Sequence, residues 1–176
     1  MILKGFKEKS NKKHLNKLLD NRQVNVNNDK VISLGVILNI DEFDDFEAFN
    51  ILAEYIKVRP NRLKIIAYSS SKKNDLLSWN ECYNPKDFGW KGDIKNSELQ
   101  TFLDTKFDVL ISYYEKEILE LKLITAESKA KFKIGILQPD ERLNDLIIKT
   151  NLKQFNLFKE EVFKYLTIFK KISSNE

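Results

Sequence analysis

The chain has 176 residues, enough for one domain with a sizeable core, and its 42% hydrophobic and 32% charged residues are typical of a globular protein. No apolar run approaches the ~20 residues of a membrane span, and the first residues lack the apolar core of a signal peptide. One cysteine and one histidine exclude an internal disulfide and a zinc site built from Cys and His. We therefore expect a cytoplasmic protein.

The positive charge is concentrated at the N-terminus. Residues 1–22 carry seven basic and two acidic side chains, whereas the other 154 residues are almost neutral. We interpret residues 1–28 as a basic helical arm in which Lys12 and Lys13 contact an acidic protein, RNA or a membrane surface. The alternative is a helix that docks its apolar residues on the body of the protein, namely Leu15, Leu18 and Leu19.

The remainder, 29–176, reads as one α/β domain because strand and helix patterns alternate. Strands are predicted at 31–38, 62–69, 107–113 and 132–137, with a possible short one at 145–149, and helices at 43–58, 97–104, 116–128 and 152–172. The pattern predicts a Rossmann-like, three-layer domain with a mainly parallel sheet of four or five strands and helices on both faces. The link before 145–149 is too short for a crossover helix, so that edge is expected to be antiparallel or irregular.

A long segment without periodicity, 70–95, leaves the carboxyl end of the second predicted strand. Loops of this length are usually functional or contain hidden structure. This one interleaves aromatic and basic side chains that are suited to a protein partner or to stacked bases: Lys72, Lys73, Trp79, Phe88 and Trp90. In the alternative interpretation the segment folds back and packs its aromatic residues as a satellite core.

The first strand-to-helix turn argues against nucleotide binding. Residues 39–45 contain no glycine and four acids, whereas a phosphate cradle needs glycine and avoids carboxylates. Asp41, Asp44 and Asp45, together with Glu42, could hold Mg²⁺. The alternative is that these acids cap the helix that follows and complement its dipole.

A second polar cluster precedes the fourth predicted strand. Ser128, Lys129 and Lys131, together with Ser69 at the end of the second strand, could contact a phosphate. They could equally be the solvated end of a helix, where cations are favoured. His14 lies in a lysine-rich stretch and is expected to be solvated, so no nucleophile is matched with a base. We expect no cofactor and assign no catalytic residue.

Two stretches carry a resemblance: Phe107-Asp108-Val109-Leu110-Ile111 and the run from Ala126 to Gly135. They resemble an uncharacterised family of small bacterial α/β proteins with the pattern F-D-x-L-I, a helix, and S-x-A-K-x-K-(V/I)-G. The resemblance implies the fold but no activity. The same stretch is similar to the N-terminal half of heptosyltransferase-like glycosyltransferases, although the second, nucleotide-sugar-binding domain is lacking and Ser112 stands where an acid is expected.

These observations favour a non-enzymatic binding protein that uses the basic arm and the 70–95 loop to contact a protein partner. One alternative is a small enzyme or ligand-binding domain for a nucleotide, a sugar phosphate or a Mg²⁺-dependent substrate at the carboxyl edge of the sheet. The other is a weak RNA-binding protein.

Overall fold

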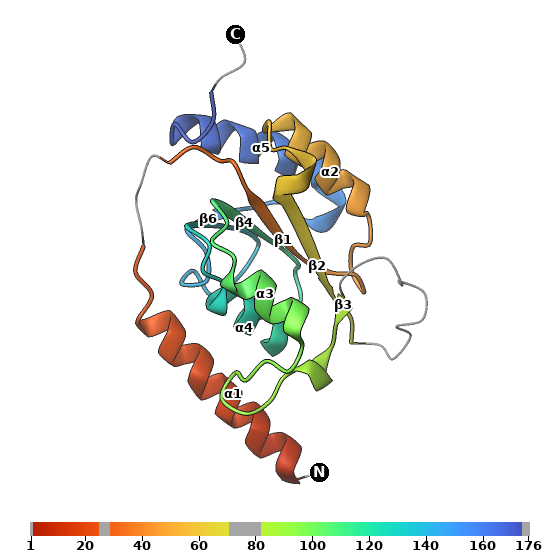
Figure 1. The fold of residues 1–176 in the computed structure, drawn as a ribbon, viewed down its shortest axis with the longest axis vertical. Helices are drawn as coiled ribbons and strands as arrows, with labels where there is room; N and C mark the ends of the chain where they lie inside the picture. Colours follow the sequence, from red (N-terminus) through yellow and green to blue (C-terminus); the bar gives the residue numbers. More distant parts are fainter. Residues whose placement is uncertain (1, 25–28, 71–81, 174–176) are drawn as a thin grey trace.

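A parallel sheet forms the middle layer of the computed structural model, which describes residues 2–24, 29–70 and 82–173 (Figure 1). Within these residues the sheet has six strands in the order β3-β2-β1-β4-β5-β6, and every neighbouring pair is parallel. The strands are β1 (Leu34–Asn39), β2 (Leu63–Tyr68), β3 (Cys82–Tyr83), β4 (Val109–Tyr113), β5 (Phe132–Ile136) and β6 (Leu146–Ile148). The predicted α/β class and parallel sheet are confirmed, with six strands rather than four or five.

Helices cover both faces of the sheet and complete three layers (Figure 1). On one face lie α2 (Phe46–Tyr55) and α5 (Phe155–Ile168), and on the other lie α1 (Ile2–Asp20), α3 (Ser97–Asp104) and α4 (Leu119–Glu127). β1 is buried along its whole length because it lies at the centre. Its Val36 and Leu38 pack under α2 and α5, while Ile37 packs against the other helices, as expected for side chains that alternate along a strand.

The edge at β6 differs from the sequence-based expectation. β6 pairs in parallel with β5, in the register Ile134↔Leu146 to Ile136↔Ile148, so the prediction of an antiparallel or irregular edge is wrong. The connection 137–145 contains no crossover helix. Instead, its Leu143 is buried in the core. Its buried Asn144 accepts a hydrogen bond from Ser112 and donates one to Gln138. A short irregular link can therefore support a parallel pair when it satisfies its own polar groups.

The described part of the 70–95 segment begins at residue 82 and adds a short strand, β3, to the sheet. β3 pairs with the end of β2, and Phe88 forms an antiparallel bridge with Ile94. Phe88 is fully buried, 6.0 Å from the Tyr83 ring centroid to centroid. The part 82–95 therefore follows the satellite-core interpretation. Among the described residues, no helix is long and apolar enough to cross a membrane.

Candidate functional site

The turn after β1 occupies the position where open parallel sheets bind ligands. The chain leaves β1 toward β2 on one side and reaches β4 on the other, so the carboxyl ends of β1 and β4 form the topological switch point. Asp41 in this turn accepts hydrogen bonds from the Ser69 hydroxyl (2.8 Å) and from the backbone N–H (2.8 Å) and hydroxyl (2.6 Å) of Ser70. Burial by itself would raise the pKa of Asp41, but these hydrogen bonds lower it. Asp41 thus ties the end of β2 to the turn.

Glu42 closes the gap between β1 and β4. Its carboxylate accepts hydrogen bonds from the side chain of Asn39 (2.7 Å) and from the backbone N–H groups of Glu115 (3.3 Å) and Lys116 (3.1 Å). These backbone donors follow the carboxyl end of β4. An internal carboxylate therefore holds donors of the kind that bind a phosphate in nucleotide-binding sheets.

The other two acids of the turn do not join Asp41. The Asp45 carboxylate caps α2 by accepting from the Ala48 N–H (3.0 Å), and Asp44 is exposed. Across the described part of the chain, no group of three or more His, Cys, Asp or Glu side chains is placed to hold a metal ion. The structure thus does not bring the predicted Mg²⁺ ligands together, and the capping alternative describes Asp45.

The predicted phosphate contacts lie at opposite ends of the sheet. Ser69 follows the carboxyl end of β2, whereas Ser128, Lys129 and Lys131 precede the amino end of β5. Lys131 pairs with Asp108 (2.9 Å) and Asp29 (3.2 Å). Lys129 pairs with Asp104 (2.5 Å), and the Ser128 hydroxyl accepts from the Ala130 N–H (3.3 Å). The structure does not assemble these four residues into one site.

The N-terminal helix α1 is docked on the body along its second half. Leu15 and Leu19 are buried and Leu18 is half-buried, as the docking alternative predicts. The buried Asn11 side chain donates to the Gly89 carbonyl (3.2 Å) and accepts from the Gly92 N–H (3.0 Å). α1 is therefore held to the 88–94 turn by hydrogen bonds as well as by apolar contacts.

His14 also contributes to this docking rather than being solvated. Its Nε2 lies 2.5 Å from a Glu127 carboxylate oxygen at the end of α4, and only 27% of each side chain is exposed. The expectation of a solvated histidine is therefore wrong. His14 is shielded because α4 packs alongside α1. The lysine-rich sequence around His14 gives no sign of this tertiary contact.

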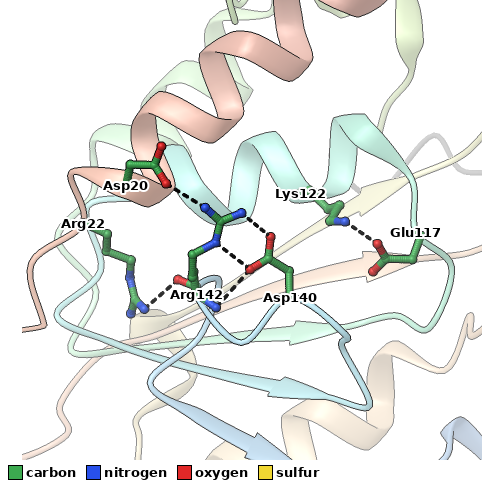
Figure 2. Close-up of polar contacts among 6 residues, drawn as sticks. All are labelled: Asp20, Arg22, Glu117, Lys122, Asp140 and Arg142. Carbon is green, nitrogen blue, oxygen red and sulfur yellow. Dashed lines mark hydrogen bonds and ion pairs between the residues drawn. The ribbon is translucent and has the colours of Figure 1, made fainter.

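Ionic contacts fasten the C-terminal end of α1 (Figure 2). Arg142 lies between Asp20 of α1 (2.7 Å) and Asp140 (2.9 Å), and its hydrogen bonds lower the pKa of Asp140. Arg22 donates to the Arg142 carbonyl (2.9 Å). It also pairs with the buried Asp145 carboxylate (2.5 Å). The connection 137–145 thus leads into β6 and also holds the C-terminal end of α1 by ion pairs.

One flank of α1 and Lys91 of the 88–94 turn line a basic groove of 550 Å³. Lys13, Lys17 and Lys91 lie along it, and we call this surface the α1 groove. Trp90, next to Lys91 in the chain, is 49% exposed. Lys12 lies on the other flank, near Glu117 and Asp140, and pairs with Glu8 (2.7 Å).

The structure places the contact residues predicted from the sequence in different parts of the molecule. Lys13 lines the α1 groove together with Lys91, the neighbour of Trp90 in the chain, whereas Lys12 lies on the other flank of α1 and Phe88 is in the core. Lys72, Lys73 and Trp79 lie outside the described residues. Asn11, which connects the two segments, carries no recognisable motif, so sequence reasoning missed it.

A second pocket, of 490 Å³, lies beside the acidic turn between the start of α2 and the segment formed by η4 (Leu152–Gln154) and α5. We call it the carboxyl-edge pocket. Its lining combines apolar and charged side chains: Glu42, Phe43, Asp45, Ala48, Ile51, Leu152, Lys153, Phe155, Asn156 and Lys159. The lysines come from a helix that sequence reasoning treated only as an apolar stripe, and no local pattern predicts their proximity to the turn.

Strand order and layers define an α/β protein with Rossmann topology, in which the Glu42 carboxylate accepts hydrogen bonds from backbone N–H groups at the switch point. The chain belongs to a family of unknown function, DUF6913, whose model matches residues 7–169. The match includes most of α1 and all six strands, and the predicted membership of an uncharacterised α/β family is confirmed. A comparison with curated proteins finds no match. The similarity to heptosyltransferase-like glycosyltransferases stays a prediction.

Proposed function

We propose that this chain is a non-enzymatic binding protein that contacts an acidic surface of a protein partner through the α1 groove. The observation that carries the proposal is the juxtaposition of Lys13 and Lys17 on α1 with Lys91 beside the exposed Trp90. Within the described residues, no ion pair engages these three lysines. Their charges are thus available to a partner, unlike those of Lys129 and Lys131.

The composition of this surface suits protein recognition. A half-exposed tryptophan next to cationic side chains is typical of the residues that dominate binding energy at interfaces. The lysine charges would accelerate association with an acidic partner, and the complex would weaken as salt screens them. Because Asn11 and Leu15 hold α1 against the body, the groove is preorganised and little ordering is needed on binding.

Paired charge reversals test the proposal. Deleting the helix would remove core residues Leu15 and Leu19, so Lys13→Glu with Lys91→Glu is the better variant. Lys106→Glu with Lys149→Glu is the matched control, since both lysines are exposed and lie outside the groove. Wild type and control should retain the same partner in quantitative affinity purification from the native cell, and the groove variant should lose it. Equal retention by all three proteins would refute the α1 groove as the contact surface.

RNA binding by α1 is an alternative that the same purification separates. The groove has lysines rather than the planar guanidinium groups that best recognise phosphates and bases, and this favours a protein partner. If the captured material is RNA that ribonuclease removes, the protein-partner proposal fails and the RNA alternative stands. Its affinity would then fall steeply with salt.

The remaining alternative is a ligand-binding or enzymatic site at the carboxyl edge of the sheet. The carboxyl-edge pocket supports it, whereas the glycine-free turn and the Glu42 carboxylate disfavour a nucleotide or a sugar phosphate there. Thermal shift against nucleotides, sugar phosphates and Mg²⁺ tests it: stabilisation by any of them supports this alternative, and no response across the panel excludes these ligand classes.

A further inference from the structure

The carboxyl-edge pocket combines position and size that suit a small ligand. It adjoins the turn after β1 and lies next to the crevice between β1 and β4, where open α/β sheets hold their ligands. Its 490 Å³ is within the ordinary range of small-molecule sites. The pocket lies between the start of α2 and the η4–α5 segment, and Glu42 is part of its lining.

The pocket has an apolar part. The rings of Phe43 and Phe155 are stacked with centroids 5.7 Å apart and planes 16° apart. Ile51 is 50% exposed at the same pocket, and Leu152 contributes from η4. An apolar group placed here would remove these side chains from water, at a gain of about 25 cal/mol per Å² of buried surface.

The pocket also has charges of both signs in equal number. Glu42 and Asp45 come from the turn, and Lys153 and Lys159 come from η4 and α5. Asp45 uses one oxygen, Oδ1, to cap α2. Lys159 lies over the Tyr55 ring, 4.9 Å from its centroid, and pairs with Glu160 (3.9 Å). In the described part of the chain Lys153 makes no ion pair. A ligand with a single strong charge would meet repulsion as well as attraction here.

We propose that the carboxyl-edge pocket binds a zwitterionic α-amino acid with an apolar side chain. Its carboxylate pairs with Lys153, its ammonium group pairs with Asp45, and its side chain packs on Phe43, Phe155 and Ile51. Such a ligand complements the apolar, the acidic and the basic side chains of the pocket. A phosphate would instead bring two negative charges toward Glu42 and Asp45. The proposal rests on the ligand-binding alternative and is independent of the α1 groove.

Titration calorimetry with three probes tests the match of charges. L-phenylalanine has both charges, 3-phenylpropionate lacks the ammonium group, and L-phenylalaninamide lacks the carboxylate. L-phenylalanine should bind about tenfold more tightly than either of the others, since each lacks one charge-assisted hydrogen bond. No detectable binding of phenylalanine at millimolar concentration, or equal affinity for all three probes, would overturn the proposal.

Matched variants place the binding in the pocket. Asp45→Asn removes the charge but keeps a good N-cap for α2, and Lys153→Gln removes an exposed cation. Each should weaken phenylalanine binding about tenfold. Asp44→Asn and Lys149→Gln, which remove the same charges outside the pocket, should leave it unchanged. Binding that survives both pocket variants would refute this site, while the charge-reversal test of the α1 groove would be unaffected.

Discussion

The carboxylate of Glu42 accepts a hydrogen bond from the backbone N–H of Lys116, 3.1 Å away, and so joins the turn after β1 to the end of β4. The two segments are 74 residues apart in the chain and meet at the topological switch point. In nucleotide-binding sheets a ligand phosphate accepts hydrogen bonds from backbone N–H groups at this end of the sheet. Here the acceptor is part of the protein.

Replacing Glu42 by glutamine should destabilise the fold. The amide cannot accept all of the hydrogen bonds that the carboxylate accepts from Asn39, Glu115 and Lys116, and it lacks the charge that strengthens them. We expect a loss of about 1–3 kcal/mol in the free energy of unfolding, measured by urea denaturation. The neighbouring Asp44→Asn is the control and should change it by less than about 0.5 kcal/mol. Equal effects of the two substitutions would show that Glu42 has no special role.

Asn11→Ala should loosen α1. It leaves the Gly89 carbonyl and the Gly92 N–H without their partner in a buried setting. The expected cost is about 2–3 kcal/mol, with faster hydrogen exchange of the α1 amides than in wild type. Asn16→Ala, at an exposed position on the same helix, is the control. If α1 exchange is unchanged in Asn11→Ala, the hydrogen bonds of Asn11 do not contribute to holding the helix.

Lys133 should make stability depend on pH in the alkaline range. Burial first, and then the positive charge of Arg22, lower the pKa of Lys133 from 10.5 to about 8. The native chain therefore loses this proton at lower pH than the unfolded chain, and stability rises with pH between these two values. Relative to Lys133→Met, the wild type should gain about 2 kcal/mol from pH 7.5 to 9.5 in urea denaturation.

The comparison with Lys133→Met cancels the tyrosines and other lysines that titrate in the same range. Lys133→Arg is the control because arginine stays charged throughout and should show no gain relative to Lys133→Met. A constant difference between wild type and Lys133→Met at both pH values would contradict the lowered pKa. The Lys133 ammonium donates to the Thr125 and Ala126 carbonyls at the end of α4, so both variants are compared only in their pH dependence.

Asp108 should make the stability of the fold depend on pH in the acidic range. Burial alone would raise its pKa, but hydrogen bonds from Lys131, from the Ile32 N–H and from Ser33 lower it below its ordinary value of 3.8. The stabilisation is therefore complete above that value and is lost as the pH falls through the folded-state pKa. At pH 7 Asp108→Asn should cost about 1–3 kcal/mol. The difference from wild type should shrink below pH 4, and a difference that stays constant down to pH 2 would contradict this account.

Several local features could be predicted from the sequence because they depend on nearest neighbours. The β-branched run around Val36 predicts a buried strand, and acids before Phe46 predict a helix start, which Asp45 provides. The β6 edge could not be predicted, because it depends on the packing of Leu143 and on hydrogen bonds between Asn144, Gln138 and Ser112. A connection of this length gives no periodic signal.

The candidate sites divide in the same way. Lys13 and Trp90 were both found as chemical types suited to binding, but the tertiary hydrogen bonds of Asn11 and the apolar packing of α1 place their segments side by side. The four acids of 41–45 looked like cation ligands, whereas the tertiary structure directs Asp41 to Ser69 and Glu42 to Lys116. The sequence indicated a ligand site at the carboxyl edge and its acids at 41–45. It did not indicate the second wall of the carboxyl-edge pocket, which lies more than 100 residues further along the chain.

The charge of the chain shows what each level decides. The sequence by itself determined that the excess positive charge lies in residues 1–22, that an internal disulfide is excluded and that strand and helix patterns alternate as in an α/β protein. Only the tertiary structure decided which lysines are neutralised, because an ion pair needs a partner within about 4 Å and such partners come from distant segments. Lys129 and Lys131 meet Asp104 and Asp108, while Lys13, Lys17 and Lys91 are left along one groove.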